Sequence, residues 1–284
     1  VTAGGNWEGH NILVRPERGV LSRPEAVEAG RVALLGHRNG RVRPGLDDKV
    51  LTGWNAMAVA ALAEAGRALD GPDWLAEAER LARFLLGALR RPDGRWLRSW
   101  QAGSARDGAT TAGRHLAYAS DHAWLVEAFT RLAEATGAAV WVGEAVAAAD
   151  ALIDLFWEEA AGAFVTAGRD AEALIASPVD THDGALPSAN SVAATALQRL
   201  SALTGEERFR DRAAAVIEAM GPALGAAPIA FSGMVAAATM LQRGLTEVVV
   251  TGDRPDLLAA VTGRYLPSAV WAWGEPFDSP LWEG

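Results

Sequence analysis

The chain has 284 residues, a formal net charge of −9 at pH 7 and no cysteine, and half of its residues are hydrophobic. This composition supports a sizeable core, and the lack of cysteine excludes disulfides, a thiolate nucleophile and cysteine-ligated metals. The acidic balance, with a pI near 5.1, argues against nucleic acid and anionic membranes as partners.

Neither a secretory leader nor a membrane span is predicted. The first nine residues are polar and glycine-rich, and no apolar run approaches the ~20 residues that a spanning helix needs. Together with the absence of disulfides, these features favour a cytoplasmic location. Because the chain opens in loop-like sequence and residues 279–284 contain no closing element, we expect it to be a fragment of a longer protein.

Helical periodicity covers most of the chain. In order, helices are predicted at 22–37, 48–66, 73–91, 120–136, 140–158, 188–204, 206–220 and 232–243. The first has Ser22 as its expected N-cap, followed by Pro24 and Glu25. Irregular segments at 92–114 and 160–186 interrupt the helices, and the first of these includes a short strand.

The pattern changes towards the C-terminus. Thr246–Thr251 is a β-branched run bounded by glycines, which predicts a buried strand. A short helix is predicted at 255–263 and a second strand at Ser268–Trp273. We therefore divide the chain into a helical part, 1–245, and a small α/β appendage packed on it, 246–284.

One pattern recurs three times in the helical part. An Ala/Leu-rich helix leads to a glycine, a short turn and an aromatic residue follow, and a second helix begins; the glycines are Gly66, Gly137 and Gly205, spaced 71 and 68 residues apart. A fixed period of two helices is typical of stacked helical hairpins. The predicted fold is therefore all-α, an (α/α) toroid that is incomplete, because four first helices are visible where a closed six-hairpin ring needs six.

The first helices of the repeats begin at matching positions. Ser120 and Ser188 lie 17 residues before their glycines, Asp48 lies 18 before its own, and Ser232 opens a fourth comparable helix. If the hairpins wind round one axis, these helices run parallel and their N-termini gather at one end. That end carries partial positive charge and unpaired N–H groups, which attract carboxylates, phosphates or sugar hydroxyls.

Three polar clusters fall at these helix starts. In the first, Asp47, Asp48 and Lys49 precede Trp54 and Asn55. Paired acids beside a lysine can hold a general acid and a general base at different pKa values. Helix capping by the acids and core packing of the tryptophan explain the same residues equally well. The asparagine is less easily explained, since it is a mediocre helix former.

The other two clusters also admit two interpretations. His122, next to Asp121, is a candidate general base near neutral pH. Adjacent helical residues point about 100° apart, so a first-turn histidine without a chemical role is the simpler interpretation. The third cluster contains Asp183 in a turn and Asn190 in the first turn of a helix, and Ser188 there is expected to be a cap rather than a nucleophile.

No metal or cofactor site is predicted. The five histidines, at positions 10, 37, 115, 122 and 182, lack metal-binding spacing, and the glycine-rich stretches lack the strand–turn–helix context of nucleotide sites. Trp96, Trp100 and Trp157 flank the irregular segments, where aromatic faces suit stacking on sugar rings. Trp74 and Trp141 recur at equivalent turns and are expected to pack between hairpins.

Several short motifs occur in an order known from one family. They are Gly5-Asn6-Trp7-Glu8-Gly9 with Asn11-Ile12-Leu13, Asp47-Asp48-Lys49-Val50-Leu51-Thr52 with Trp54-Asn55, and Asp183-Gly184-Ala185 with Pro187-Ser188 and Asn190-Ser191. Over nearly its whole length the chain resembles the thioredoxin-domain proteins related to the spermatogenesis-associated thioredoxin-like protein. The resemblance implies a toroid similar to six-hairpin glycosidases and to N-acylglucosamine and cellobiose 2-epimerases. It also implies an upstream thioredoxin-like domain in the full-length protein, which this chain lacks.

The sequence departs from that family where the helix N-termini are expected to gather. Ser120-Asp121-His122 stands where two acids and a tyrosine are usual, Ser177-Pro178-Val179 where Arg-Pro-Lys is usual, and Ala56 and Ala189 where glycine is usual. Without that arginine and lysine, the expected site at the helix N-termini is less suited to binding an anionic ligand. No two histidines fall at equivalent helix starts, so the two-histidine mechanism of the epimerases is not carried over.

The leading hypothesis is a sugar-binding or sugar-processing toroid with its ligand at the helix N-termini. If it hydrolyses, Asp48 and Asp121 are the acid–base pair, and the expected substrate-binding residues are Asp47, Lys49, Trp54, Asn55, His122, Asp183 and Asn190. The alternative is a non-catalytic recognition or scaffold module that serves the upstream thioredoxin-like domain. A third interpretation makes the polar helix starts caps only, with no concave cavity at that end.

Overall fold

The computed structural model describes residues 2–12, 24–102, 112–172, 175–176 and 178–283. The chain divides into two compact units, Val1–Asp47 and Asp48–Gly284. The sequence pattern gave no indication of a boundary at this position.

The first unit contains a tight loop and one helix. Asn6 closes the loop, since its side chain donates to the carbonyl of Ile12 (2.8 Å) and accepts from the Ile12 N–H (2.6 Å). Helix α1 spans Glu25–Asn39 and has no buried side chain. The expected N-cap, Ser22, lies outside the described residues. This unit therefore adds little apolar burial.

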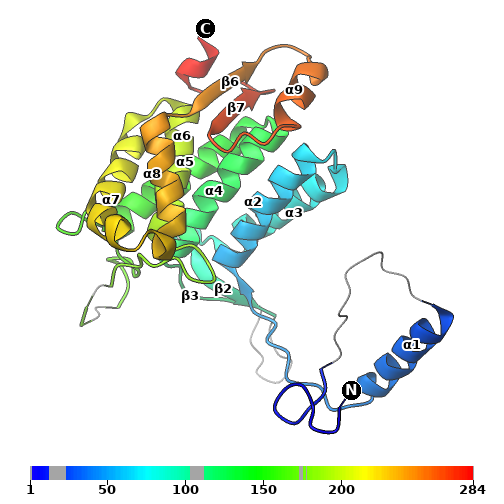
Figure 1. Cartoon of the computed structure of the whole chain (residues 1–284). Coiled ribbons are helices and arrows are strands. Elements are labelled where there is room, and N and C mark those ends of the chain that lie inside the picture. Colours follow the sequence, from blue (N-terminus) through cyan, green and yellow to red (C-terminus); the bar gives the residue numbers. More distant parts are fainter. Residues whose placement is uncertain (1, 13–23, 103–111, 173–174, 177, 284) are drawn as a thin grey trace. The chain divides into compact units, whose positions relative to one another are not determined.

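The second unit is built from helical hairpins, as the repeat predicts. The pairs are α2 (Thr52–Ala68) with α3 (Pro72–Leu89), α4 (Ala119–Thr136) with α5 (Ala139–Phe156), and α6 (Ala189–Thr204) with α7 (Glu207–Ala226), and α8 (Ser232–Arg243) packs on α6. The first helices, α2, α4, α6 and α8, contact one another in that order and form one layer (Figure 1). The second helices pack against it, which gives an incomplete (α/α) toroid.

Small residues allow the first helices to pack closely. Alanines with fully buried side chains recur along this layer, at Ala56, Ala63, Ala123, Ala193 and Ala237. The two central helices, α4 and α6, are buried almost all round, including many of their polar residues. A helix buried on every side belongs to the centre of a domain, so these two helices hold the unit together.

Two of the three repeat glycines end helices. Gly137 and Gly205 follow α4 and α6 in the left-handed conformation, with φ of 69° and 75°. Gly66 instead lies inside α2, which continues to Ala68, two residues beyond the predicted end. A Cβ atom at Gly66 would lie 3.0 Å from the backbone nitrogen of Leu75. This glycine therefore allows α2 and α3 to approach each other.

Short strands lie around the starts of the first helices. β1 (Val50–Leu51), β2 (Leu97–Gln101) and β3 (Ala112–Leu116) form an antiparallel sheet in that order. β1 occupies the place where the sequence predicted the beginning of a helix, and α2 starts only at Thr52. β4 (Trp157–Glu158) and β5 (Ala163–Phe164) pair within the second irregular segment.

The C-terminal segment has the predicted strand–helix–strand order. β6 (Thr246–Val250) and β7 (Ala269–Trp273) are parallel neighbours joined through α9 (Pro255–Thr262). Short 3₁₀ turns lie at Pro228–Phe231 and Pro280–Trp282. β7 packs on α4 and α6.

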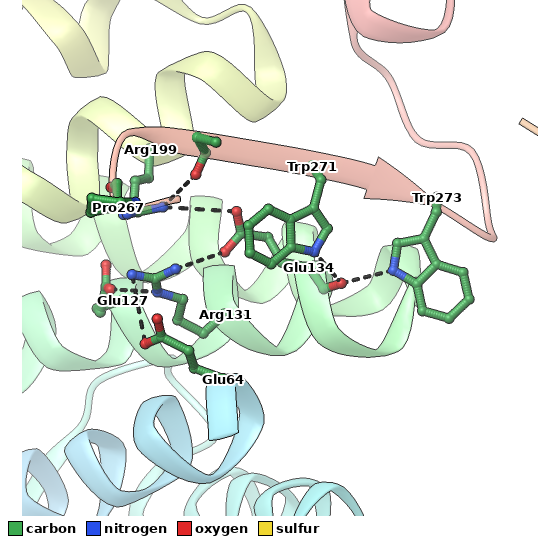
Figure 2. A network of polar contacts seen from close by, with 9 residues as sticks. Glu64, Glu127, Arg131, Glu134, Arg199, Pro267, Trp271 and Trp273 are labelled. Atoms are coloured by element: carbon green, nitrogen blue, oxygen red, sulfur yellow. Dashed lines mark hydrogen bonds and ion pairs between the residues drawn. The ribbon is translucent and has the colours of Figure 1, made fainter. Parts of the chain in front are cut away.

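β7 covers the end of α4 with two indole groups (Figure 2). The Nε1–H groups of Trp271 and Trp273 both donate to the backbone carbonyl of Glu134, at 3.0 and 2.7 Å. Carbonyls in the last turn of a helix have no partner within the helix. The two tryptophans satisfy this one from outside.

A buried ionic network lies beside this contact (Figure 2). Arg131 bonds Glu127 at 2.8 Å and Glu134 at 3.3 Å, and Arg199 lies 3.9 Å from Glu134. Arg199 also donates to the carbonyls of Pro267 and Ala269. Burial raises the pKa of Glu134 despite the two arginines. The network links α4 and α6 to the segment that leads into β7.

Among the described residues, no helix has both the length and the apolar character required to cross a bilayer.

Candidate functional site

The N-termini of the first helices meet, as the matching repeat starts predict. Asp121 of α4 binds the first turn of α2, and Asp183 binds the first turns of both α6 and α8. The N–H of Ala119, at the start of α4, donates to the carbonyl of Thr166 (3.1 Å), in the irregular segment that leads to α6. Polar residues distant in sequence thus gather at one end of the helical layer.

Asp121 is a fully buried anchor. One carboxylate oxygen accepts from the Gly53 N–H and the other from the Tyr118 N–H, both at 2.8 Å. Arg98 donates to both oxygens, at 2.8 and 2.9 Å. A Cβ atom at Gly53 would lie 2.8 Å from the carboxylate, so only glycine allows this approach. A substrate cannot reach this carboxylate, since protein donors surround it.

Asp48, the second predicted catalytic acid, is exposed and stands apart from Asp121. It accepts a hydrogen bond from the Gln101 side chain at 2.5 Å. The N-cap position of α2 belongs to Leu51, so the interpretation of Asp48 as that cap is wrong. Among the described contacts, Asp48 and Asp121 share no partner. Lys49 is also exposed, and Asp47 belongs to the first unit.

Trp54 lies at the surface, so its interpretation as a core residue is wrong. Its side chain is 62% exposed, and it follows Gly53, the residue bound by Asp121. Asn55 donates to the carbonyl of Leu51 at 2.8 Å, which explains an asparagine in the first turn of α2.

Besides Gln101, two residues that the sequence did not single out lie next to Asp121. Arg98 projects from β2, and its guanidinium lies over the ring of Tyr118, 4.9 Å from the ring centre. Tyr118 is 41% exposed and directly precedes α4. In the sequence, the position of Tyr118 directly before a predicted helix was the signal that could have pointed to it. We call Asp48, Trp54, Arg98, Gln101 and Tyr118 the aromatic–arginine surface.

His122 is buried and neutral, which removes it as an accessible base. Its Nε2 lies 3.4 Å from Arg95, a permanent donor, so Nδ1 carries the proton and donates to the Tyr118 carbonyl at 3.1 Å. The ring packs on Phe156. Burial lowers the pKa of His122 to about 4. The arginine in turn is held by Asp170 at 2.7 Å.

Asp183 joins two helix starts. One carboxylate oxygen accepts from the Ser188 N–H (2.8 Å), and the other accepts from the N–H groups of Gly233 (2.7 Å) and Met234 (3.4 Å). Partial burial favours the protonated acid, but these donors and the Ser191 hydroxyl outweigh it and lower the pKa of Asp183. The negative charge stabilises the positive ends of α6 and α8.

Asn190 is completely buried and bonded on both sides. Its amide donates to the carbonyls of Phe164 (2.9 Å) and Asp180 (2.7 Å), and its oxygen accepts from the Phe164 N–H (2.9 Å). Ser188 caps α6 as predicted, since its Oγ accepts from the Ser191 N–H. Asn190 therefore attaches the β4–β5 segment to α6, and it has no donor left for a ligand.

Three mammalian relatives of this chain carry one name. The sequence is 30% identical to spermatogenesis-associated protein 20 of Rattus norvegicus over 285 residues, which cover 94% of this chain and 36% of the relative. It is 29% identical to the Homo sapiens protein over 253 residues, 86% of this chain and 32% of the relative. These homologues confirm the resemblance seen in the motifs. The chain spans about a third of the length of the curated relatives it matches. No protein-family model matches it.

Solved structures with similar helical arrangements are more distant. D-mannose isomerase has a TM-score of 0.46 at 16% identity, over 61% of this chain and 42% of that one. The unsaturated glucuronyl hydrolase of Bacillus sp. GL1 has 0.49 at 17%, over 63% and 49%. Cellobiose 2-epimerase of Bacillus thermoamylovorans B4167 has 0.48 at 16%, over 61% and 44%. At this level the likeness says nothing about a shared ligand or reaction.

Proposed function

We propose that the second unit binds a carbohydrate at the aromatic–arginine surface and does not use Asp48 and Asp121 as an acid–base pair. The observation that supports this most directly is the exposed ring of Trp54, which directly follows Gly53 at the helix start where Asp121 is held by Arg98. The bound sugar stacks on the indole face and exchanges hydrogen bonds with the polar side chains around it.

A sugar ring matches this set of groups. One face of a pyranose presents C–H bonds, which pack on an aromatic ring, while its edge presents hydroxyls that both donate and accept. Gln101 and Arg98 supply donors and Asp48 supplies an acceptor. The chain buries several of its other tryptophans well, for example Trp141 to 1% exposure and Trp96 to 3%. An indole that remains in water at a polar surface suits contact with a ligand better than core packing.

Hydrolysis needs an acid that can deliver a proton to the substrate. Asp121 has no exposed surface, and its two oxygens are occupied by Gly53, Tyr118 and Arg98. His122 is buried as well. Asp121 and His122 therefore have structural roles beneath the surface. The accessible groups are suited to binding a carbohydrate rather than to cleaving it.

A titration with a panel of neutral and acidic mono- and disaccharides, followed by isothermal calorimetry or tryptophan fluorescence, tests the proposal. Trp54→Ala should weaken binding about tenfold, as expected for a lost stacking contact. The matched control is Trp74→Ala, which removes a comparably exposed indole (46%) from α3. Equal affinities in the two variants, or no binding across the panel, would contradict the proposal.

The second candidate is a scaffold that presents a partner to a thioredoxin-like domain of a longer protein. The observation that favours it is the length of the relatives, of which this chain spans about a third. In this case no sugar binds. Substitutions on the outer helices α3, α5 and α7 abolish binding of the upstream part of the protein, while Trp54→Ala leaves that binding unchanged. Pull-down of the upstream part of the protein with these variants distinguishes the two candidates.

A further inference from the structure

A cavity lies at the opposite end of α2 from the aromatic–arginine surface. Its volume is about 630 Å³, and it opens where the parallel strands β6 and β7 end. Its lining includes Arg67, Val250, Pro255, Leu258, Trp273 and Trp282. Trp54 and Arg67 are thirteen positions apart on α2, about 20 Å at the rise of an α-helix. The cavity is therefore independent of the proposed sugar site.

Arg67 is the unusual member of this lining. Its guanidinium lies over the ring of Trp273, 4.7 Å from the ring centre, and its Nε is buried without a hydrogen-bond partner. In the described part of the chain, no carboxylate forms an ion pair with it. Burial lowers the pKa of Arg67, and the charge of Asp70 offsets this only in part. Arginine stays charged at any physiological pH. The guanidinium of Arg67 can therefore pair with an anion that the chain itself does not supply.

Two other charged residues line the cavity, Arg254 and Asp253, and Asp253 is exposed to solvent. Arg254 is held by both carboxylate oxygens of Asp256, at 3.0 and 2.8 Å. The same carboxylate accepts from backbone N–H groups of the first turn of α9. The positive end of this helix is thus neutralised by the chain itself, and of the two cations in the lining Arg67 is the one left for an anionic ligand.

Apart from Thr251 and the exposed Asp253, the side chains of the remaining lining are largely apolar. Val250, Pro255 and Leu258 contribute aliphatic surface, and Trp282 contributes an indole whose Nε1 is buried without a partner. A bare inorganic anion would lose its hydration against such walls without compensation. A carboxylate attached to a planar apolar group would pair with the guanidinium fork and bury its apolar part.

We propose that this cavity binds a small organic carboxylate with an aromatic or other planar apolar group. The carboxylate accepts two parallel hydrogen bonds from Arg67, and the apolar part lies against Trp282, Leu258 and Pro255. The stacking of Arg67 on Trp273 fixes the plane of the guanidinium before the ligand arrives, which reduces the entropy lost on binding.

Benzoate is a suitable probe for the full 284-residue chain, with benzamide as its neutral isostere and inorganic phosphate as the bare anion. Indole ¹H–¹⁵N signals report binding, since Trp273 and Trp282 line the cavity. We expect benzoate to shift both signals and to bind at least about tenfold more tightly than benzamide, as charge-assisted hydrogen bonds imply. Benzamide binding as tightly as benzoate, or phosphate binding more tightly, would overturn the proposal.

Substitutions in the lining test whether benzoate binds in this cavity. Arg67→Met should weaken benzoate binding about tenfold or more. Arg83→Met is the matched control, because Arg83 also stacks on a tryptophan, Trp141 at 5.4 Å, but lies on α3 away from the cavity. Should Arg67→Met unfold the chain, Thr251→Phe fills the exposed rim instead and should also abolish binding. Unchanged affinity in a folded Arg67→Met or Thr251→Phe protein refutes the site.

Discussion

Asp121 joins the first turn of α2, the first turn of α4 and strand β2 through a single carboxylate. Its partner Gly53 is 68 residues away in the sequence. The buried charge is tolerated because each oxygen has strong donors. Arg98 supplies the compensating positive charge and at the same time carries its guanidinium to the surface beside Tyr118.

Replacement of Arg98 by methionine should therefore destabilise the chain. The change leaves a fully buried carboxylate with only two backbone donors, and removal of one partner of a buried pair costs about 3 kcal/mol in comparable cases. Urea denaturation measures the loss, with Arg80→Met, which breaks an exposed pair with Glu77, as the control. The control should change stability by less than about 1 kcal/mol. A similar small effect of Arg98→Met would show that Asp121 does not depend on its charge.

His122 makes stability depend on pH. Its pKa is about 4 in the folded chain, against about 6.5 in an unfolded one. As the pH falls below 6.5 the unfolded state takes up a proton that the folded state does not, so stability decreases, by about 2 kcal/mol between pH 8 and pH 5. Chemical denaturation at a series of pH values measures this slope.

The comparison that isolates His122 is the slope of the His122→Gln variant. Glu134 acts in the opposite direction, because its raised pKa favours proton uptake by the folded state. The variant should lose the destabilisation below pH 6.5 that the parent chain shows, while His182→Gln, at an exposed position, should retain it. Parallel slopes for the parent and His122→Gln would contradict a buried neutral histidine.

Helix α4 ends at a glycine for two reasons that act together. Gly137 has a φ of 69°, and a Cβ atom there would lie 2.9 Å from the ring of Trp273. The left-handed conformation strains any residue with a side chain, and β7 leaves no room for one. The glycine thus both ends α4 and permits the docking of β7 against it.

Alanine substitutions at two glycines should therefore have opposite effects. Gly137→Ala should destabilise the chain by about 3 kcal/mol, the sum of backbone strain and overpacking. Gly87→Ala, in the interior of α3 with no atom within 4 Å of the added Cβ, should stabilise it by about 0.5–1 kcal/mol. Thermal unfolding of both variants, measured side by side, checks the signs. A neutral Gly137→Ala would mean that β7 is not seated on this turn.

At the scale of the whole molecule, the features predicted from sequence are those with local causes. Alanine-rich periodicity, turn residues and a β-branched run determine helices and strands over short stretches, and their order predicts the hairpins and the C-terminal strand–helix–strand unit. Even the gathering of helix starts follows from the spacing of the repeat. The shift of the α2 start from Asp48 to Thr52 needed β2, a partner about 50 residues away, with which β1 pairs.

The roles of the site residues could not be predicted, because burial depends on distant partners. Asn190 and Asp183 look like ligand-binding groups in the sequence, yet their partners Phe164 and Gly233 lie 26 and 50 residues away and use their hydrogen-bonding capacity. Trp54 shows the reverse, since an indole in an alanine-rich helix suggests a core position but lies at the surface. The division at Asp47 likewise had no local sign.

The two indole bonds to Glu134 also impose an order of events during synthesis. Trp271 follows Glu134 by 137 residues, so at 5–20 residues per second the ribosome completes α4 roughly 7–27 s before its last turn can be covered. For that interval the Glu134 carbonyl and the charges around it face water. The helical hairpins must therefore persist with one end open until the strand–helix–strand unit has been made and can close it.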